Sequence, residues 1–257
     1  MNDINEQYNR ITETFNRLRS VIENDIPKSE YENSLKALLR CSDKIDELGV
    51  ITQLKQINFY TSQVLMRVIF EHYLVSDYIF TRSYKDKSDD VGEEYYKHYY
   101  CAEFFKRKSY SVQVDEIAEG KKQKRSSLEI IKENHPEFED LSENDFAEIN
   151  RIKNTFYDLK KIGEYLITSE SEKNSVQDFN KAKLDLIKRY SDLSSYVHGG
   201  PIAEQDYLSK DEKETDQIID ENRSWYKIAS KQSKLNLLNL CAMEFGLTYL
   251  KELEKLK

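Results

Sequence analysis

Residues 64–80 read VLMRVIFEHYLVSDYIF, and this stretch decides the fold. Apolar side chains lie on nearly every face of a helix drawn through it, which is typical of a helix buried at the centre of a globular protein. Arg67, Glu71, His72 and Asp77 interrupt the run, so it cannot cross a bilayer alone. We expect residues 52–84 to form the longest and most buried helix of the chain.

The segments on either side have the three- and four-residue spacing of amphipathic helices. Residues 4–23 carry one apolar stripe, and a second helix is expected to end at Leu48, with Gly49 as its left-handed C-cap. Further helices are predicted over residues 93–108, 128–131, 150–167, 176–196 and 225–256, and Ser142 is expected to cap the element that leads into the third of these.

Glycine and proline are scarce, with seven and three residues among 257, which argues against sandwiches and barrels because those folds need frequent turns. No segment shows the alternation of a half-buried strand. The fold class is therefore predicted to be all-α, a helical bundle of about eight helices, more than about 65% helical and without a sheet.

Charge and cysteine content restrict the environment and the partners. The formal net charge is −8, so broad binding to duplex DNA is not expected. Cys41, Cys101 and Cys241 are far apart in apolar patterns, which favours buried thiols over disulfides or a metal site. The polar start of the chain lacks a secretory signal, so we expect a cytoplasmic protein without a membrane partner.

A basic segment contrasts with the acidic chain. Residues 97–132 hold nine Lys or Arg against five Asp or Glu. Two interpretations remain open: a solvated, salt-bridged helix face, or a phosphate-binding face that contacts RNA. The residues concerned are Lys121, Lys122, Lys124 and Arg125, preceded by Lys106, Arg107 and Lys108.

Most motifs of known chemistry are missing. The sequence has no GxGxxG, Walker, HExxH, GxSxG or EF-hand pattern, so no cofactor is expected. The four histidines, His72, His98, His135 and His198, show no ligand-type spacing, and no metal site is predicted.

His198 stands at the end of a predicted helix, in KRYSDLSSYVHGGP (residues 188–201). The negative end of the helix macrodipole favours a protonated imidazole there. The histidine could cap helix carbonyls structurally, or it could act as a general acid–base or phosphate-contacting group in a cleft.

Arg67 and Glu71 are four residues apart on the helix least able to expose charge. A buried charge without a partner costs several kcal/mol, so the two side chains should form a buried structural ion pair or face a polar cleft. The second interpretation places them in one cleft with His198.

The R-x-x-x-E pattern of Arg67 and Glu71, followed by Tyr190 and L-S-x-x-x-H-G over residues 193–199, resembles HEPN-like helical proteins. In particular it resembles a bacterial family of unknown function that is linked with abortive infection and toxin systems, and thus with phage defence. The resemblance implies a HEPN-like core of four to five helices over residues 51–257, with residues 1–50 as an N-terminal layer. It also implies a frequent homodimer, and active members that cleave RNA without metal.

This chain departs from the pattern of active members, in which an arginine precedes the histidine by five to seven positions. Here those positions hold Leu193, Asp192 and Ser191, and the nearest upstream arginine is Arg189. Nine residues turn a helix through about 900°, so Arg189 and His198 should face opposite sides. Arg67 is the candidate replacement.

Two functional hypotheses follow. The first is a metal-independent ribonuclease or toxin effector, in which His198 is the acid–base, Arg67 holds the phosphate and Glu71 orients Arg67. In this hypothesis Tyr190 and Ser194 add hydrogen bonds. The second is a degenerate, non-enzymatic module that binds a protein partner or a small ligand in the same cleft.

Overall fold

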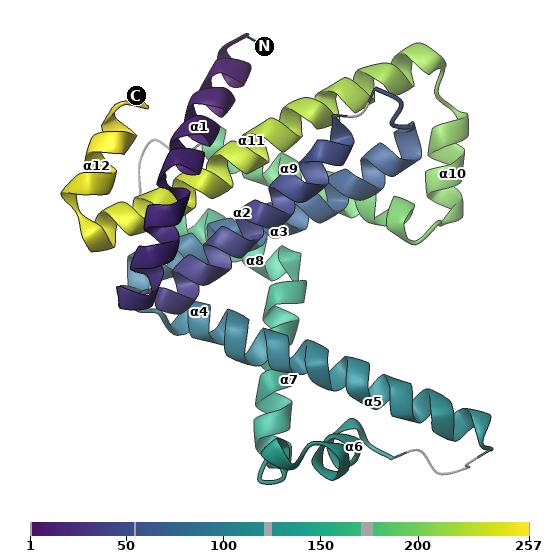
Figure 1. Cartoon of the computed structure of the whole chain (residues 1–257). Coiled ribbons are helices and arrows are strands. Elements are labelled where there is room, and N and C mark those ends of the chain that lie inside the picture. Colours follow the sequence, from purple (N-terminus) through teal and green to yellow (C-terminus); the bar gives the residue numbers. More distant parts are fainter. Residues whose placement is uncertain (1, 54, 121–124, 171–176, 257) are drawn as a thin grey trace. The chain divides into compact units, whose positions relative to one another are not determined.

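The computed structural model describes residues 2–53, 55–120, 125–170 and 177–256 (Figure 1). Of these residues 87% are helical, and the described part contains no strand. The predicted all-α fold class is confirmed. None of the described helices combines the length and apolar character that crossing a bilayer requires.

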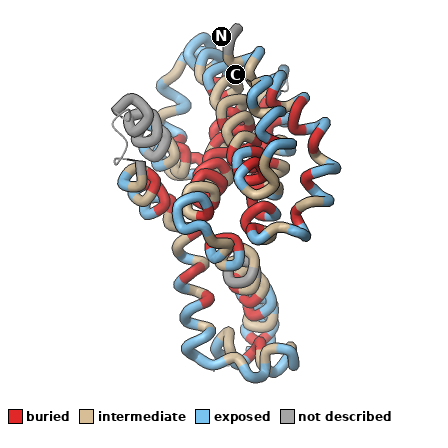
Figure 2. Tube along the Cα trace, turned by 90° about the vertical axis from the view of Figure 1, so that its left-hand side faces the viewer, coloured by how far each residue is buried: buried red, intermediate tan, exposed pale blue. Residues whose placement is uncertain are grey.

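The chain divides into two compact units, residues 1–92 with 159–257 and residues 93–158. In the first unit, α3 (Phe59–Asp86) packs against α2 (Glu32–Thr52), α8 (Leu159–Glu170), α9 (Gln177–Val197) and α11 (Glu212–Phe245). Its central position was predicted. Asn58 is the N-cap of α3, and its side-chain oxygen accepts a 2.8 Å hydrogen bond from the Thr61 amide. Buried residues follow the inward sides of the helices in Figure 2.

The two N-terminal helices belong to this same unit. α1 (Asn2–Asp25) contacts α11, and α2 contacts both α3 and α11. A short 3₁₀ turn, η1 (Ile26–Lys28), joins them. The predicted apolar stripe of α1 is buried at Ile11, Phe15, Leu18 and Ile22.

The predicted C-cap at Gly49 is wrong. Helix α2 continues to Thr52, and Gly49 does not adopt a positive φ. Instead, a Cβ placed on Gly49 would lie 1.8 Å from Cε2 of Tyr226 on α11. The glycine is therefore required by close helix packing rather than by helix termination.

Residues 93–158 fold around a core of Ala102, Phe105, Ile131 and Ile149. After α4 (Asp90–Glu93), the helices of this part are η2 (Glu94–Tyr99, a π-helix), α5 (Tyr100–Ala118), α6 (Ser127–Asn134), η3 (Pro136–Phe138) and α7 (Glu143–Tyr157). Ser142 caps α7 as predicted, in a capping box with Asp145. The single helix predicted over residues 150–167 is interrupted at Asp158, where the two units meet in sequence.

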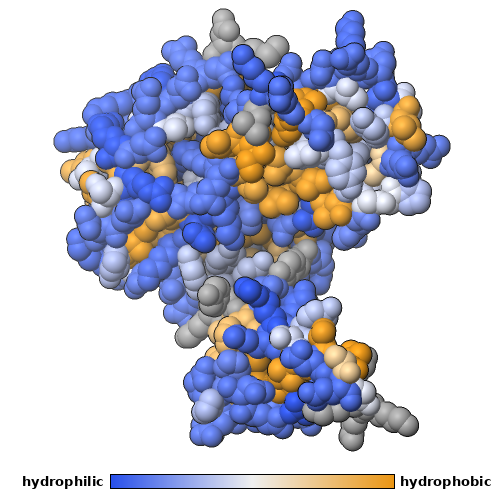
Figure 3. Space-filling view, turned by 45° about the vertical axis from the view of Figure 1, so that its right-hand side comes forward, coloured by the Kyte–Doolittle hydropathy of each residue, from blue (hydrophilic) through white to orange (hydrophobic). Residues whose placement is uncertain are grey.

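The C-terminal part differs most from the prediction. α10 (Pro201–Leu208) was not predicted. The first half of α11 was not predicted either, because residues 212–224 are mostly polar. α11, with 34 residues, is longer than α3, with 28, so the prediction of the longest helix is wrong. Gly246 has a φ of 71° and separates α11 from α12 (Leu247–Glu254), where one continuous helix was expected. Figure 3 shows a mainly hydrophilic surface with apolar side chains gathered in patches.

Candidate functional site

Arg67, Glu71 and Tyr190 lie together where α3 packs against α9. Residues four apart share a helix face, and Arg67 Nη1 donates a 2.7 Å hydrogen bond to Glu71 Oε2. Arg67 Nη2 donates a 2.6 Å hydrogen bond to the Tyr190 hydroxyl, 123 positions away in sequence. The side chains of Arg67 and Glu71 are 21% and 18% exposed, so the ion pair reaches solvent at one side.

Some hydrogen-bonding groups of this cluster have no partner among the described residues. Arg67 Nε is buried and has no hydrogen-bond partner in the described part of the chain. The guanidinium carbon lies 5.0 Å from the centroid of the Tyr190 ring, which adds a cation–π contact. Because Tyr190 accepts the hydrogen bond from Arg67, its own hydroxyl proton can be donated to another group.

Burial raises the pKa of the Tyr190 phenol, and the neighbouring charge of Arg67 opposes part of this shift. Tyr190 is therefore a neutral hydrogen-bond donor at physiological pH. A cationic guanidinium next to a phenolic donor is an arrangement suited to binding an oxyanion such as a phosphate.

Ser194 and His198 follow Tyr190 at successive four-residue intervals along α9. The Ser194 hydroxyl donates a 3.0 Å hydrogen bond to the Tyr190 carbonyl oxygen, so it is used locally. His198 is exposed, immediately after the last residue of α9. Its ring makes no hydrogen bond or ion pair within the described part of the chain.

The end of α9 is capped by backbone groups rather than by the histidine ring. Gly199 has a φ of 61°, and its amide donates a 3.3 Å hydrogen bond to the Tyr196 carbonyl. The Gly200 amide donates to the Ser195 carbonyl at 3.2 Å. The imidazole of His198 is therefore left available for another role.

The arrangement of α3 and α9 separates His198 from the arginine cluster. The Tyr60 hydroxyl donates to the Tyr196 carbonyl near the start of α3, whereas Arg67 meets Tyr190 farther along the same helix. Seven residues of helix span about 10 Å. The structure thus brings together Arg67, Glu71 and Tyr190, and it places His198 about two turns away along the same helix pair.

Arg189, the arginine nearest upstream of His198, is directed elsewhere. Its Nη2 donates a 2.7 Å hydrogen bond to Oδ1 of the buried Asn222 on α11, and its guanidinium lies 6.0 Å from the Trp225 ring centroid. Asn222 in turn donates to Ser62 Oγ at 2.9 Å and Gln63 Oε1 at 2.8 Å on α3. Burial lowers the pKa of Arg189. The sequence did not predict this network, because its members are scattered polar residues without a motif.

The basic segment is described only in part. Lys121, Lys122 and Lys124 lie outside the described residues. Arg125 forms ion pairs with Glu116 and Glu133, at 2.5 Å from Oε1 of Glu116, and these carboxylates offset its charge. Upstream on α5 the exposed cations are Lys106, Arg107 and Lys108.

Among the described residues, histidines, cysteines and carboxylates form no group of three or more that could hold a metal ion. No protein-family model, curated protein or solved structure matches this chain. The assignment of function therefore depends on the geometry of the site.

Proposed function

We propose that the protein is a HEPN-like, metal-independent ribonuclease or toxin effector that binds RNA along the junction of α3 and α9. The observation that carries this proposal is the Arg67–Tyr190 hydrogen bond, which joins the two parts of the sequence that resemble HEPN-like proteins. The imidazole of His198, directly after the end of α9 and without a partner among the described residues, supports it.

In this proposal Arg67 and Tyr190 bind phosphate, and His198 transfers a proton. Arg67, held by Glu71, supplies positive charge for a phosphate, and Tyr190 donates a hydrogen bond to the same group. The ribose 2′-oxygen attacks phosphorus and loses its proton, while the bond to the 5′-oxygen breaks and that oxygen gains a proton. The imidazole of His198 carries out one of these two proton transfers and solvent carries out the other. Because two helical turns separate them, Arg67 and His198 would contact different phosphates of one strand.

A fluorogenic single-stranded oligoribonucleotide, assayed in chelator, tests the proposal. His198→Ala should lower kcat by roughly 10² to 10⁴ without changing the melting temperature, because its ring makes no hydrogen bond or ion pair with the described residues. Arg67→Ala should raise KM strongly with a smaller effect on kcat, because Arg67 contacts a phosphate other than the one that reacts, and Arg67→Lys should be intermediate. Gln205→Ala, at an exposed position of α10, is the control and should retain full activity.

Cleavage that survives both His198→Ala and Arg67→Ala, or that requires a divalent metal, would contradict the mechanism. An oligodeoxyribonucleotide of the same sequence should remain intact, because it lacks the attacking hydroxyl. Cleavage of this DNA would show that the reaction does not use the ribose 2′-hydroxyl and would contradict the mechanism.

One observation favours a second function, a non-enzymatic binding module. Both terminal nitrogens of Arg67 are already engaged by Glu71 and Tyr190. If Arg67 keeps both hydrogen bonds when a ligand is present, the cluster only holds α3 and α9 together and does not bind phosphate. In that case purified protein leaves RNA intact, His198→Ala is silent, and a stable protein partner or small ligand is recovered with the wild-type chain.

A further inference from the structure

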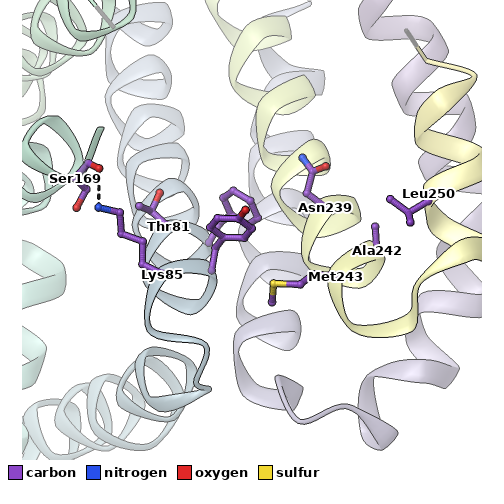
Figure 4. A pocket seen from close by; sticks show the side chains of 9 residues that line it. Thr81, Lys85, Ser169, Asn239, Ala242, Met243 and Leu250 are labelled. Carbon is purple, nitrogen blue, oxygen red and sulfur yellow. Dashed lines mark hydrogen bonds between the residues drawn. The ribbon is translucent and has the colours of Figure 1, made fainter. Parts of the chain in front are cut away.

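A cavity of about 730 Å³ opens between α3, α8, α11 and α12, in the unit that contains the candidate site (Figure 4). This volume lies within the range of small-molecule sites. Its walls come from all four helices: Phe80, Thr81, Tyr84, Lys85, Ser169, Asn239, Ala242, Met243 and Leu250.

The apolar part of the cavity is exposed to solvent. The rings of Phe80 and Tyr84 lie with centroids 5.9 Å apart and planes 31° from each other. Tyr84, Met243 and Leu250 are 51%, 37% and 44% exposed. Contiguous exposed apolar side chains in a concavity indicate a surface that a ligand covers.

The polar groups of the cavity include a cation, Lys85, that has no counter-ion among the described residues. Lys85 Nζ donates a 2.6 Å hydrogen bond to the Ser169 carbonyl, a neutral acceptor, and the described lining residues include no carboxylate. The Thr81 hydroxyl and the Asn239 amide have no hydrogen-bond partner among the described residues. These groups can donate to an anionic oxygen acceptor at the cavity.

We propose that this cavity binds an amphipathic monocarboxylate, a molecule with an apolar body and one carboxylate. The apolar body would cover Phe80, Tyr84, Met243 and Leu250, and the carboxylate would pair with Lys85. A charge-assisted hydrogen bond at the edge of an apolar surface is stronger than a neutral one, so the cavity selects acids over alcohols of equal length. This proposal is independent of RNA cleavage.

Calorimetric titration with octanoate, octan-1-ol and octylammonium tests the head-group preference at constant chain length. Octanoate should bind at least tenfold more tightly than either of the others. Equal binding of the three, or binding of the amine in preference, would overturn the proposal.

Methionine methyl resonances locate the binding site. The chain has three methionines, of which Met243 lines the cavity and Met66 is fully buried elsewhere on α3. Titration with octanoate should shift the Met243 methyl signal and leave that of Met66 in place. Calorimetric binding without a shift of Met243 would place the ligand elsewhere and refute the assignment.

Two variants probe the charge. Lys85→Met keeps the apolar stem and should weaken octanoate binding about tenfold, whereas Lys188→Met, an equal change of charge at an exposed position of α9, should not. Met243→Glu adds a carboxylate to the lining and should also weaken binding at least tenfold. Unchanged affinity in both cavity variants, with native circular dichroism spectra, would overturn the proposal.

Discussion

At the residue scale, Lys234 is a fully buried cation that is held by a carboxylate and a hydroxyl. Its side chain has no exposed surface. Its charge is compensated inside the protein, because Nζ lies 2.7 Å from Asp46 and 2.6 Å from the Ser230 hydroxyl. The ammonium also lies 5.8 Å and 5.6 Å from the ring centroids of Tyr8 and Phe15. Burial lowers the pKa of Lys234, and the charge of Asp46 opposes that shift.

We predict an asymmetry between the two partners. Asp46→Ala leaves a buried ammonium without its counter-ion and should cost about 3–5 kcal/mol of unfolding free energy. Lys234→Met fills the same volume, removes the buried charge and leaves a carboxylate that is 35% exposed, so it should cost only about 1–2 kcal/mol. Urea unfolding of both variants measures the difference, and a larger loss for Lys234→Met would contradict this account.

At the scale of helices, Gly49 and Tyr226 fix how closely α2 and α11 approach. The Tyr226 ring covers Gly49, and its hydroxyl lies 2.9 Å from that of Tyr8 on α1. A Cβ at position 49 must displace the ring and thereby break this contact among three helices.

Gly49→Ala should therefore destabilise the protein by about 1–3 kcal/mol, although alanine is the better helix former by about 1 kcal/mol. In a Tyr226→Ala background the same substitution should be neutral or stabilising, because the ring is absent. Thermal unfolding of the four proteins in this double-mutant cycle gives the coupling. Equal effects in the two backgrounds would show that Tyr226 is not the cause.

At the scale of the whole molecule, His72 links stability to pH. Burial, and next the charge of Lys44, lower its pKa from 6.5 to about 4. Between these values the unfolded chain binds a proton that the folded chain excludes, so the folded state loses stability as pH falls from about 6.5 towards 4.

The contribution of His72 between pH 7 and 4.5 should be about 2 kcal/mol. His72→Gln cannot be protonated, so urea unfolding of this variant should show a smaller loss of stability over the same range by that amount. Other titrating groups are common to both proteins and cancel in the comparison. Parallel pH profiles would mean that His72 is not excluded from protonation in the folded chain.

The sequence alone determined the helical class and several local features. Helical periodicity, the central position of residues 64–80 and the Ser142 cap depend on neighbours within one or two turns, and all three are found in the structure. The pairing of Arg67 with Glu71 is likewise a property of one helix face.

Tertiary structure decided the rest, because contacts between helices depend on which faces meet and at what offset. Neither feature can be derived from the periodicity of one segment. Tyr190 became the partner of Arg67 only through the packing of α9 against α3, and the same placement of α9 brings the Arg189 side chain to Asn222 on α11. The packing of α2 against α11 turned Gly49 from an expected helix end into a contact point for Tyr226. His198 is left exposed beyond the end of α9.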